Sequence, residues 1–257
     1  MGRAAAPRRH SADDYLETIY FLASPHGEYR ADESLNGSPT MAARVAELLG
    51  VSRVSAGEML RRMEANGLVV RGAAREAILT DKGRLRAEGL ARRHRLLERL
   101  LTDLMGLSPA DAHERADDVG DPFTDAEMDA LAARLGRPDR CPHGWPIDPE
   151  AERAEDRQLR RLADLAPPTS GHIVRLLEHD GVLLRWLYEE GLTPGRRFIV
   201  AELHPAAGEY VLSVDGERRT LGERAARALL VRPEEPGGRS GPRRSAGRDA
   251  ENLSARS

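Results

Sequence analysis

Residues 41–70 read MAARVAELLGVSRVSAGEMLRRMEANGLVV and contain two short helix patterns separated by a tight turn. In each pattern the apolar residues recur at three- and four-residue spacing, which places them on one face of a helix. Ser52 stands where a side chain can cap the second helix, and Asn66-Gly67 supplies residues that favour a left-handed stop. The stretch therefore predicts a helix, a turn and a second helix.

Two short runs of strand-forming residues follow, at 68–70 and 77–79, with an arginine-containing loop between them. We interpret them as the wing of a winged helix-turn-helix, although two helices that only pack in a larger bundle would show the same helical pattern. In a winged helix-turn-helix the second helix enters the major groove, and arginines hold phosphates. The residues predicted to face bases are Ser52, Arg53, Ser55 and Glu58, and those predicted to contact phosphates are Arg61, Arg62, Arg71 and Arg75.

The rest of the chain divides into further segments. Helix-start signals stand at Ser11, Ser108-Pro109 and Thr124, and a leucine-rich helix over 82–105 has more apolar surface than one small winged helix can cover. That excess implies a second copy of the chain as partner. Short strand-type runs after 170, with Asp215-Gly216 as a hairpin turn, predict a small β-barrel. The predicted class is mainly α with small β, organised as a winged helix-turn-helix domain over 1–81, a helical dimerisation domain over 82–148, a linker over 149–169, a β domain over 170–232 and a disordered tail over 233–257.

Composition limits the cellular setting. The single cysteine, Cys141, excludes an intrachain disulfide, and the sequence contains neither a membrane-spanning apolar run nor the hydrophobic core of a signal peptide. We therefore expect a cytoplasmic protein. The net charge is −3, with +4 on residues 1–100 and −7 on the remainder, so the basic half coincides with the predicted DNA-binding domain.

Five strings in the chain resemble a known family, the diphtheria toxin repressor and manganese transport regulator family of metal-dependent transcriptional repressors. They are DDYLETIYFL at 13–22, RMEANGLVV at 62–70, LTDKGR at 79–84, RRHRLLERLLTDLMGL at 92–107 and CPHGWPI at 141–147. The resemblance implies a homodimer that binds a palindromic operator on double-stranded DNA when Mn(II) or Fe(II) is bound, with an SH3-like (FeoA-like) C-terminal domain.

Candidate metal ligands gather in two places. His94 and Glu98 stand four apart on one helix, a spacing that lets an imidazole and a carboxylate reach one ion. Both match ligands of the resembled family, as does His113. Asp14 and Glu17 match the acidic pair of its manganese-type members, and oxygen ligands suit a hard ion such as Mn(II).

The stretch AHERADDVGDPF at 112–123 departs from the resembled family. Where that family has a cysteine or glutamate and, after two residues, Glu-His, this chain has Asp117, then Gly120 and Asp121. Asp117 and Asp121 can still offer oxygens, but they are shorter than glutamate, so metal affinity is expected to suffer. By the same resemblance we assign Cys141 and His143 to a turn, and Glu178 and Asp180 to the region where the family offers acidic ligands.

The working hypothesis is that a cation ties the first helix to the long helix and so fixes the spacing of two recognition helices across the dimer. One alternative keeps the DNA-binding dimer but makes it independent of metal, with the altered residues as a lost site. A hydrolytic metal site belongs to a different class, and the sequence shows no nucleophile motif and no phosphate-binding glycine loop to support an enzyme.

Overall fold

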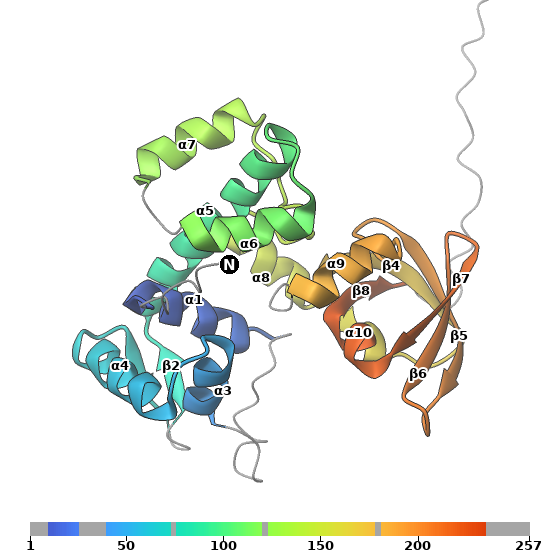
Figure 1. The fold of residues 1–257 in the computed structure, drawn as a ribbon, viewed down its shortest axis with the longest axis horizontal. Coiled ribbons are helices and arrows are strands. Elements are labelled where there is room, and N and C mark those ends of the chain that lie inside the picture. The colour runs from blue at the N-terminus through green and yellow to red at the C-terminus, as the bar shows by residue number, and fades with distance from the viewer. Residues whose placement is uncertain (1–9, 26–39, 73–75, 120–122, 178–180, 235–257) are drawn as a thin grey trace, which may run out of the picture.

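The computed structural model describes residues 10–25, 40–72, 76–119, 123–177 and 181–234 (Figure 1). Nearly all of the expected tail lies outside these ranges. The elements in chain order are α1 (Ala12–Leu22), α3 (Met41–Leu48), α4 (Arg53–Ala65), β1 (Val69–Arg71), β2 (Ala77–Leu79), α5 (Asp81–Asp103), α6 (Pro109–Val119), α7 (Asp125–Arg134), α8 (Pro149–Asp156), β3 (Arg160–Arg161), the 3-10 turn η1 (Leu162–Asp164), β4 (Thr169–Leu176), α9 (Gly181–Glu189), β5 (Arg197–His204), β6 (Glu209–Val214), β7 (Glu217–Gly222), α10 (Glu223–Ala228) and β8 (Leu229–Pro233).

The first part is a winged helix-turn-helix. Ser52 caps α4 by accepting a hydrogen bond from the Ser55 amide at 3.0 Å, and Gly67 takes the left-handed φ of 67° that ends the helix region. Strands β1 and β2 pair antiparallel as the wing. One core, which includes Leu16, Val45 and Leu60, joins α1, α3, α4 and the wing. Because this core is closely packed, a displacement of α1 must also displace α4.

The long helix α5 begins against the wing and carries the next domain. Thr80 caps it, and Gly83 passes so close to the wing that an added Cβ would lie 1.9 Å from the Leu68 carbonyl oxygen. Helices α6 and α7 pack on α5 and share a core with it. Within the described part of the chain, no helix is both long and apolar enough to cross a membrane.

The C-terminal part is a six-stranded antiparallel sheet with the order β3-β8-β4-β5-β6-β7. Asp215 and Gly216 form the predicted hairpin turn with φ values of 49° and 93°, as a type I′ turn requires. Helices α9 and α10, which the sequence analysis did not predict, contribute buried leucines and alanines to this domain's core.

The segment 149–169, treated above as a linker, is structured: it forms α8, strand β3 of the sheet, η1 and the start of β4. Its polar composition was misleading because its carboxylates are buried against arginines. Glu155 accepts hydrogen bonds from Arg140, Arg175 and Arg232 at distances of 2.7 to 2.9 Å. Burial opposes ionisation of Glu155, but Arg140 and Arg175 lower the pKa of its carboxyl to about 2. Helix α8 therefore joins the helical domain to the sheet domain through ion pairs.

Candidate metal centre and nucleic-acid interface

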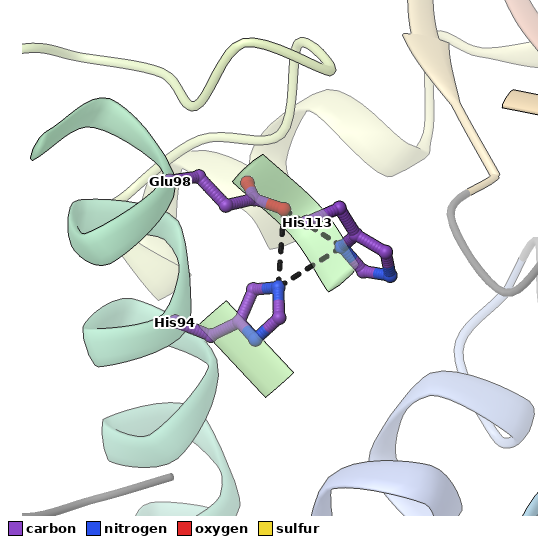
Figure 2. A group of neighbouring side chains, drawn as sticks. All are labelled: His94, Glu98 and His113. Carbon is purple, nitrogen blue, oxygen red and sulfur yellow. Dashed lines mark hydrogen bonds and ion pairs between the residues drawn. The ribbon is translucent and has the colours of Figure 1, made fainter. Parts of the chain in front are cut away.

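Helices α5 and α6 bring together three of the predicted metal ligands. His94 and Glu98 lie one turn apart on α5, with His94 Nε2 at 3.0 Å from Glu98 Oε1. His113 on α6 completes the group, since its Nδ1 lies 2.8 Å from Glu98 Oε1 and 3.0 Å from His94 Nε2. Figure 2 shows the three side chains converging between the two helices. Each offers an atom that a divalent cation can bind, and these atoms lie within 4.8 Å of one another.

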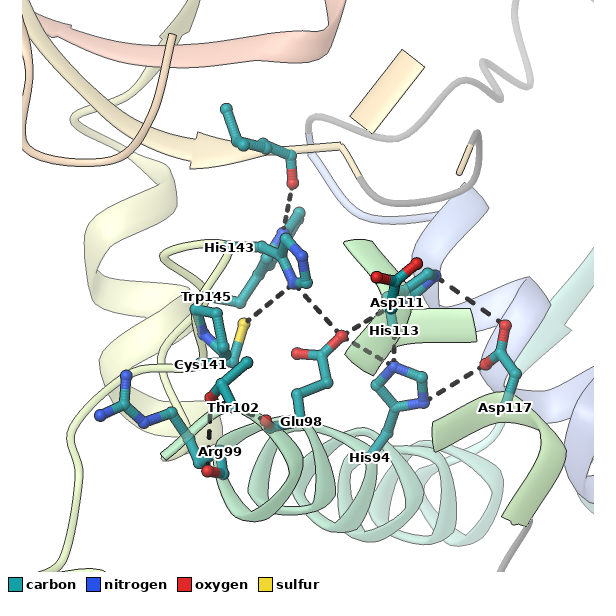
Figure 3. Close-up of polar contacts among 12 residues, drawn as sticks. His94, Glu98, Arg99, Thr102, Asp111, His113, Asp117, Cys141, His143 and Trp145 are labelled. Atoms are coloured by element: carbon teal, nitrogen blue, oxygen red, sulfur yellow. Dashed lines mark hydrogen bonds and ion pairs between the residues drawn. The ribbon is translucent and has the colours of Figure 1, made fainter. Parts of the chain in front are cut away.

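Glu98 also belongs to a second group, which the sequence analysis did not predict. His143 Nδ1 lies 3.2 Å from Glu98 Oε1, and Cys141 Sγ lies 4.0 Å from His143 Nδ1 (Figure 3). All three residues are buried. The sequence analysis placed Cys141 and His143 in a turn, and a turn is what they form; its position beside Glu98 results from tertiary packing. In the sequence, Cys141 and His143 resemble a cysteine–histidine metal pair, but a lone pair is weak evidence for a metal site, and 42 positions separate Glu98 from it.

Gly144 shows how closely this turn is packed against the sheet domain. It has a φ of +88°, and an added Cβ would lie 2.0 Å from the Val174 carbonyl oxygen. The Leu176 amide also donates to the His143 carbonyl at 3.0 Å. The turn that carries Cys141 and His143 is therefore fixed from the side of β4, and only glycine fits at position 144.

Charge is concentrated at Glu98. Burial disfavours a charge on His94, but the adjacent Glu98 carboxylate raises the pKa of the imidazole to about 10. Burial likewise opposes ionisation of Glu98, yet His143 and His94 hold its pKa well below the usual range. At neutral pH the group thus contains an ionised carboxylate beside a protonated imidazole. A cation that takes both residues as ligands displaces the His94 proton.

Two further predicted ligands lie at the edge of the group. Glu17 Oε1 on α1 is 3.9 Å from His94 Nδ1, and Asp117 Oδ1 on α6 is 3.4 Å from the same atom. Their side chains keep 38% and 52% of their surface exposed. Partial burial raises the pKa of Glu17, while His94 opposes that shift. Both carboxylates therefore flank the solvent side of His94.

The structure places Asp14 elsewhere. Its Oδ2 accepts a hydrogen bond from the Ser11 amide at 2.6 Å, so Asp14 and Ser11 form the capping box of α1. His10 Nδ1 lies 3.7 Å from the same oxygen. Asp14 is thus engaged with the helix end, and its role as a ligand stays a prediction. Asp121, Glu178 and Asp180 lie outside the described residues.

The described residues among those predicted to contact DNA are exposed on α4 and the wing. Ser52 caps α4, Arg53, Ser55 and Glu58 lie in its first two turns, and Arg61 and Arg62 follow on the same helix. Arg71 on the wing pairs with Glu64 at 3.1 Å, and Arg75 is not described. Val54 was missed by the sequence analysis, although 71% of it is exposed at the start of α4. A single exposed apolar side chain is ordinary, but Val54 stands beside Arg53 and Ser55, which are predicted to face bases.

Three family models match the chain in the same order as its parts. The iron dependent repressor N-terminal DNA binding domain matches residues 9–76, the iron dependent repressor metal binding and dimerisation domain matches 80–149, and the FeoA domain matches 160–233. The chain belongs to the iron-dependent repressor family. The winged helix-turn-helix, the helical dimerisation region and the C-terminal FeoA (SH3-like) sheet are thereby confirmed, and this repressor is a member of a family of metal-dependent, DNA-binding transcriptional regulators.

Individual relatives agree with this membership. The repressor is 31% identical over 229 residues to the iron-dependent repressor IdeR of Mycobacterium tuberculosis, a match that covers 84% of this chain and 94% of the relative. It is 35% identical over 133 residues to the diphtheria toxin repressor of Corynebacterium diphtheriae, over 52% of this chain and 54% of that one. A solved manganese-dependent transcriptional repressor in complex with manganese has a TM-score of 0.71 and 29% identity, over 87% of this chain and 100% of that one.

Proposed function

We propose that this repressor acts as a homodimer that binds a palindromic operator when Mn(II) or Fe(II) is held at the group centred on Glu98. The observation that carries the proposal is the state of that carboxylate. Glu98 is fully buried among the imidazoles of His94, His113 and His143, and its Oε2 has no hydrogen-bond partner among the described residues. A buried carboxylate with an unused oxygen is costly, and a bound cation removes that cost.

The donor set supports a first-row divalent ion. Imidazole nitrogens and carboxylate oxygens suit Mn(II) and Fe(II), and the relatives described above include an iron-dependent and a manganese-dependent repressor. Residues His94, Glu98 and His113 would hold the ion, with Glu17 and Asp117 close enough to contribute. Cys141 adds a thiol, a softer donor, next to Glu98, so Zn(II) is the ion expected to compete most strongly with Mn(II) and Fe(II) for this site.

An ion held by His94, Glu98 and His113 would supply the positive charge that lets carboxylates of different helices lie close together. Glu17 is the residue through which α1 takes part, since its carboxylate faces His94 of α5. Because α1 shares a core with α4, holding α1 against α5 also holds the recognition helix. In a dimer this fixes the distance between two recognition helices and thereby favours half-sites spaced on one face of the DNA.

Apolar side chains left exposed in the helical domain support the dimer. Leu104 and Met105, just after α5, keep more than half of their surface exposed, and Val119 at the end of α6 and Phe123 beyond it are also exposed. Isolated exposed apolar residues are ordinary, but large ones at the ends of two neighbouring helices are typical of a surface that a partner covers.

Base reading in this proposal depends on the first turns of α4. Ser52 is committed to its cap and its Oγ lies 2.9 Å from Ser55 Oγ, so Arg53, Val54 and Glu58 are the exposed side chains best placed to approach base edges, with Ser55 beside them. Val54 suits the methyl group of thymine, and Arg53 suits the acceptors of guanine. Arg61, Arg62, Arg71 and Arg75 are the proposed phosphate contacts.

The proposal predicts metal-dependent DNA binding. An operator selected from a pool of genomic fragments with Mn(II) present should bind at least about 10-fold more tightly with Mn(II) or Fe(II) than with a chelator, because the ion preorganises the dimer. Fluorescence anisotropy at fixed ionic strength measures this, with Mg(II) as the control for simple charge neutralisation. Equal affinity under all conditions would favour a metal-independent regulator.

Asp14 should serve both as a cap and as a ligand. In the metal-free protein, Asp14→Ala is expected to lower the free energy of unfolding by about 0.5 to 1 kcal/mol, because the capping box is lost. If the carboxylate also leaves Ser11 for the ion, Mn(II) affinity falls by more than about 10-fold. Asp13→Ala is the matched control, since Asp13 lies on the same turn of α1 as Asp14 but its carboxylate pairs with Arg86 of α5. A destabilised variant with unchanged Mn(II) affinity would leave Asp14 as a cap only.

A further inference from the structure

Trp145 closes the turn that carries Cys141 and His143. Its carbonyl oxygen accepts a hydrogen bond from the Cys141 amide at 2.9 Å, and its indole Nε1 donates to the Leu176 carbonyl at 2.7 Å. The side chain is almost completely buried. Trp145 therefore holds one edge of the candidate metal group against strand β4 of the sheet domain.

Two arginines lie over the Trp145 ring. The Arg95 guanidinium lies 5.3 Å from the ring centroid, and that of Arg175 lies 4.8 Å from it. Arg95 directly follows His94 on α5, and its Nη1 also donates to the Pro146 carbonyl at 2.7 Å. Cation-π contacts of this kind strengthen when they are shielded from water. The turn is thus tied to α5 on one side and to β4 on the other.

The DNA-binding domain reaches the same ring through Phe21. The Phe21 and Trp145 ring centroids lie 5.9 Å apart, with the rings tilted at 55°. Phe21 is four residues after Glu17 on α1, so both side chains are on one face of that helix. This face of α1 presents Glu17 to His94 and Phe21 to Trp145.

We propose that Trp145 and Phe21 are positioning residues that couple cation binding at Glu98 to the seating of α1 on the rest of the protein. The inference rests on the proposed function, because it concerns the same cation. An ion that fixes His143 beside Glu98 also fixes the turn, and Trp145 is the point at which α1 touches that turn. Coupling between two equilibria is reciprocal, so loosening α1 at Phe21 must weaken cation binding.

The test is a double-mutant cycle on Mn(II) affinity, measured from the electron paramagnetic resonance signal of free Mn(II) without DNA. Phe21→Leu keeps an apolar side chain but removes the ring. It is expected to weaken Mn(II) binding by about 2- to 10-fold, because that is the change in affinity to which the energy of one aromatic pair corresponds. In the Trp145→Phe background the same change should have a smaller effect, because the two residues act together.

Phe198→Leu is the matched control. Phe198 is fully buried on β5, in the same core that Trp145 enters, so this variant loosens that core without removing the Phe21–Trp145 ring contact. It should lower the melting temperature and leave Mn(II) affinity unchanged. If Phe21→Leu behaves like Phe198→Leu, the coupling is overturned while the proposed function stands. If the wild-type chain fails to bind Mn(II), the proposed function falls, and the coupling falls with it.

Discussion

The Arg175→Met substitution is expected to lower the free energy of unfolding by about 3 to 5 kcal/mol relative to the wild-type chain. Arg175 is fully buried; its Nε donates to Glu155 at 2.9 Å and its Nη1 to Asp156 at 2.8 Å. Its Nη2 also donates to the Glu152 carbonyl at 3.2 Å. Methionine fills a similar volume but leaves the two buried carboxylates without this cation, and an uncompensated buried charge is costly.

Urea unfolding followed by circular dichroism measures this change. Arg218→Met is the matched control, because Arg218 is exposed and pairs with Glu202 at 3.5 Å. An exposed pair of that kind contributes little, so the control should stay within about 0.5 kcal/mol of the wild-type chain. Equal stability of the two variants would show that the charges around α8 do not hold the sheet domain in place.

Glu98→Gln is expected to weaken Mn(II) binding by at least about 100-fold. Glu98 Oε1 lies within 3.2 Å of nitrogens on His94, His113 and His143, so this one carboxylate serves both candidate groups. The amide keeps the shape of the side chain but loses its negative charge. Since residues that only support metal ligands already contribute 10- to 100-fold in affinity, loss of a shared ligand should cost at least as much.

Glu114→Gln provides the control for this experiment. Glu114 is an exposed carboxylate on α6, one position after His113, and it lies 3.6 Å from Arg185. Its replacement should leave Mn(II) affinity within about twofold of the wild-type value, since it offers no atom to the group. Isothermal titration with Mn(II) compares the variants, and far-ultraviolet circular dichroism checks that each is folded. A Glu98→Gln chain that binds Mn(II) normally would refute the assignment of Glu98.

Local signals in the sequence were sufficient for the helices whose ends are set by their own residues. Ser11, Ser52 and Thr124 each cap the helix that was predicted to follow. The 149–169 segment was misread for the opposite reason. Its acids would suit a solvated linker, and only the arginines of distant elements make them suitable for burial. A pairing of that kind leaves no periodic pattern in the sequence.

The metal group was predictable in part. His94 and Glu98 share a helix face, which spacing reveals, and the resemblance to a family added His113. Cys141 and His143 reach Glu98 only because β4 holds their turn against α5, and no spacing within the sequence encodes that contact. Asp14 shows the reverse problem. A residue type that suits a ligand also suits a helix cap, and the cap is what the structure displays.

The three arginines around Glu155 make helix α8 depend on the FeoA domain. Arg175 and Arg232 belong to the sheet domain, whereas Arg140 precedes the CPHGW turn. Without the sheet, Glu155 would lose its ion pairs with Arg175 and Arg232, and Asp156 would lose its ion pair with Arg175. Deletion of residues 160–233, which the FeoA domain model matches, is therefore expected to destabilise α8.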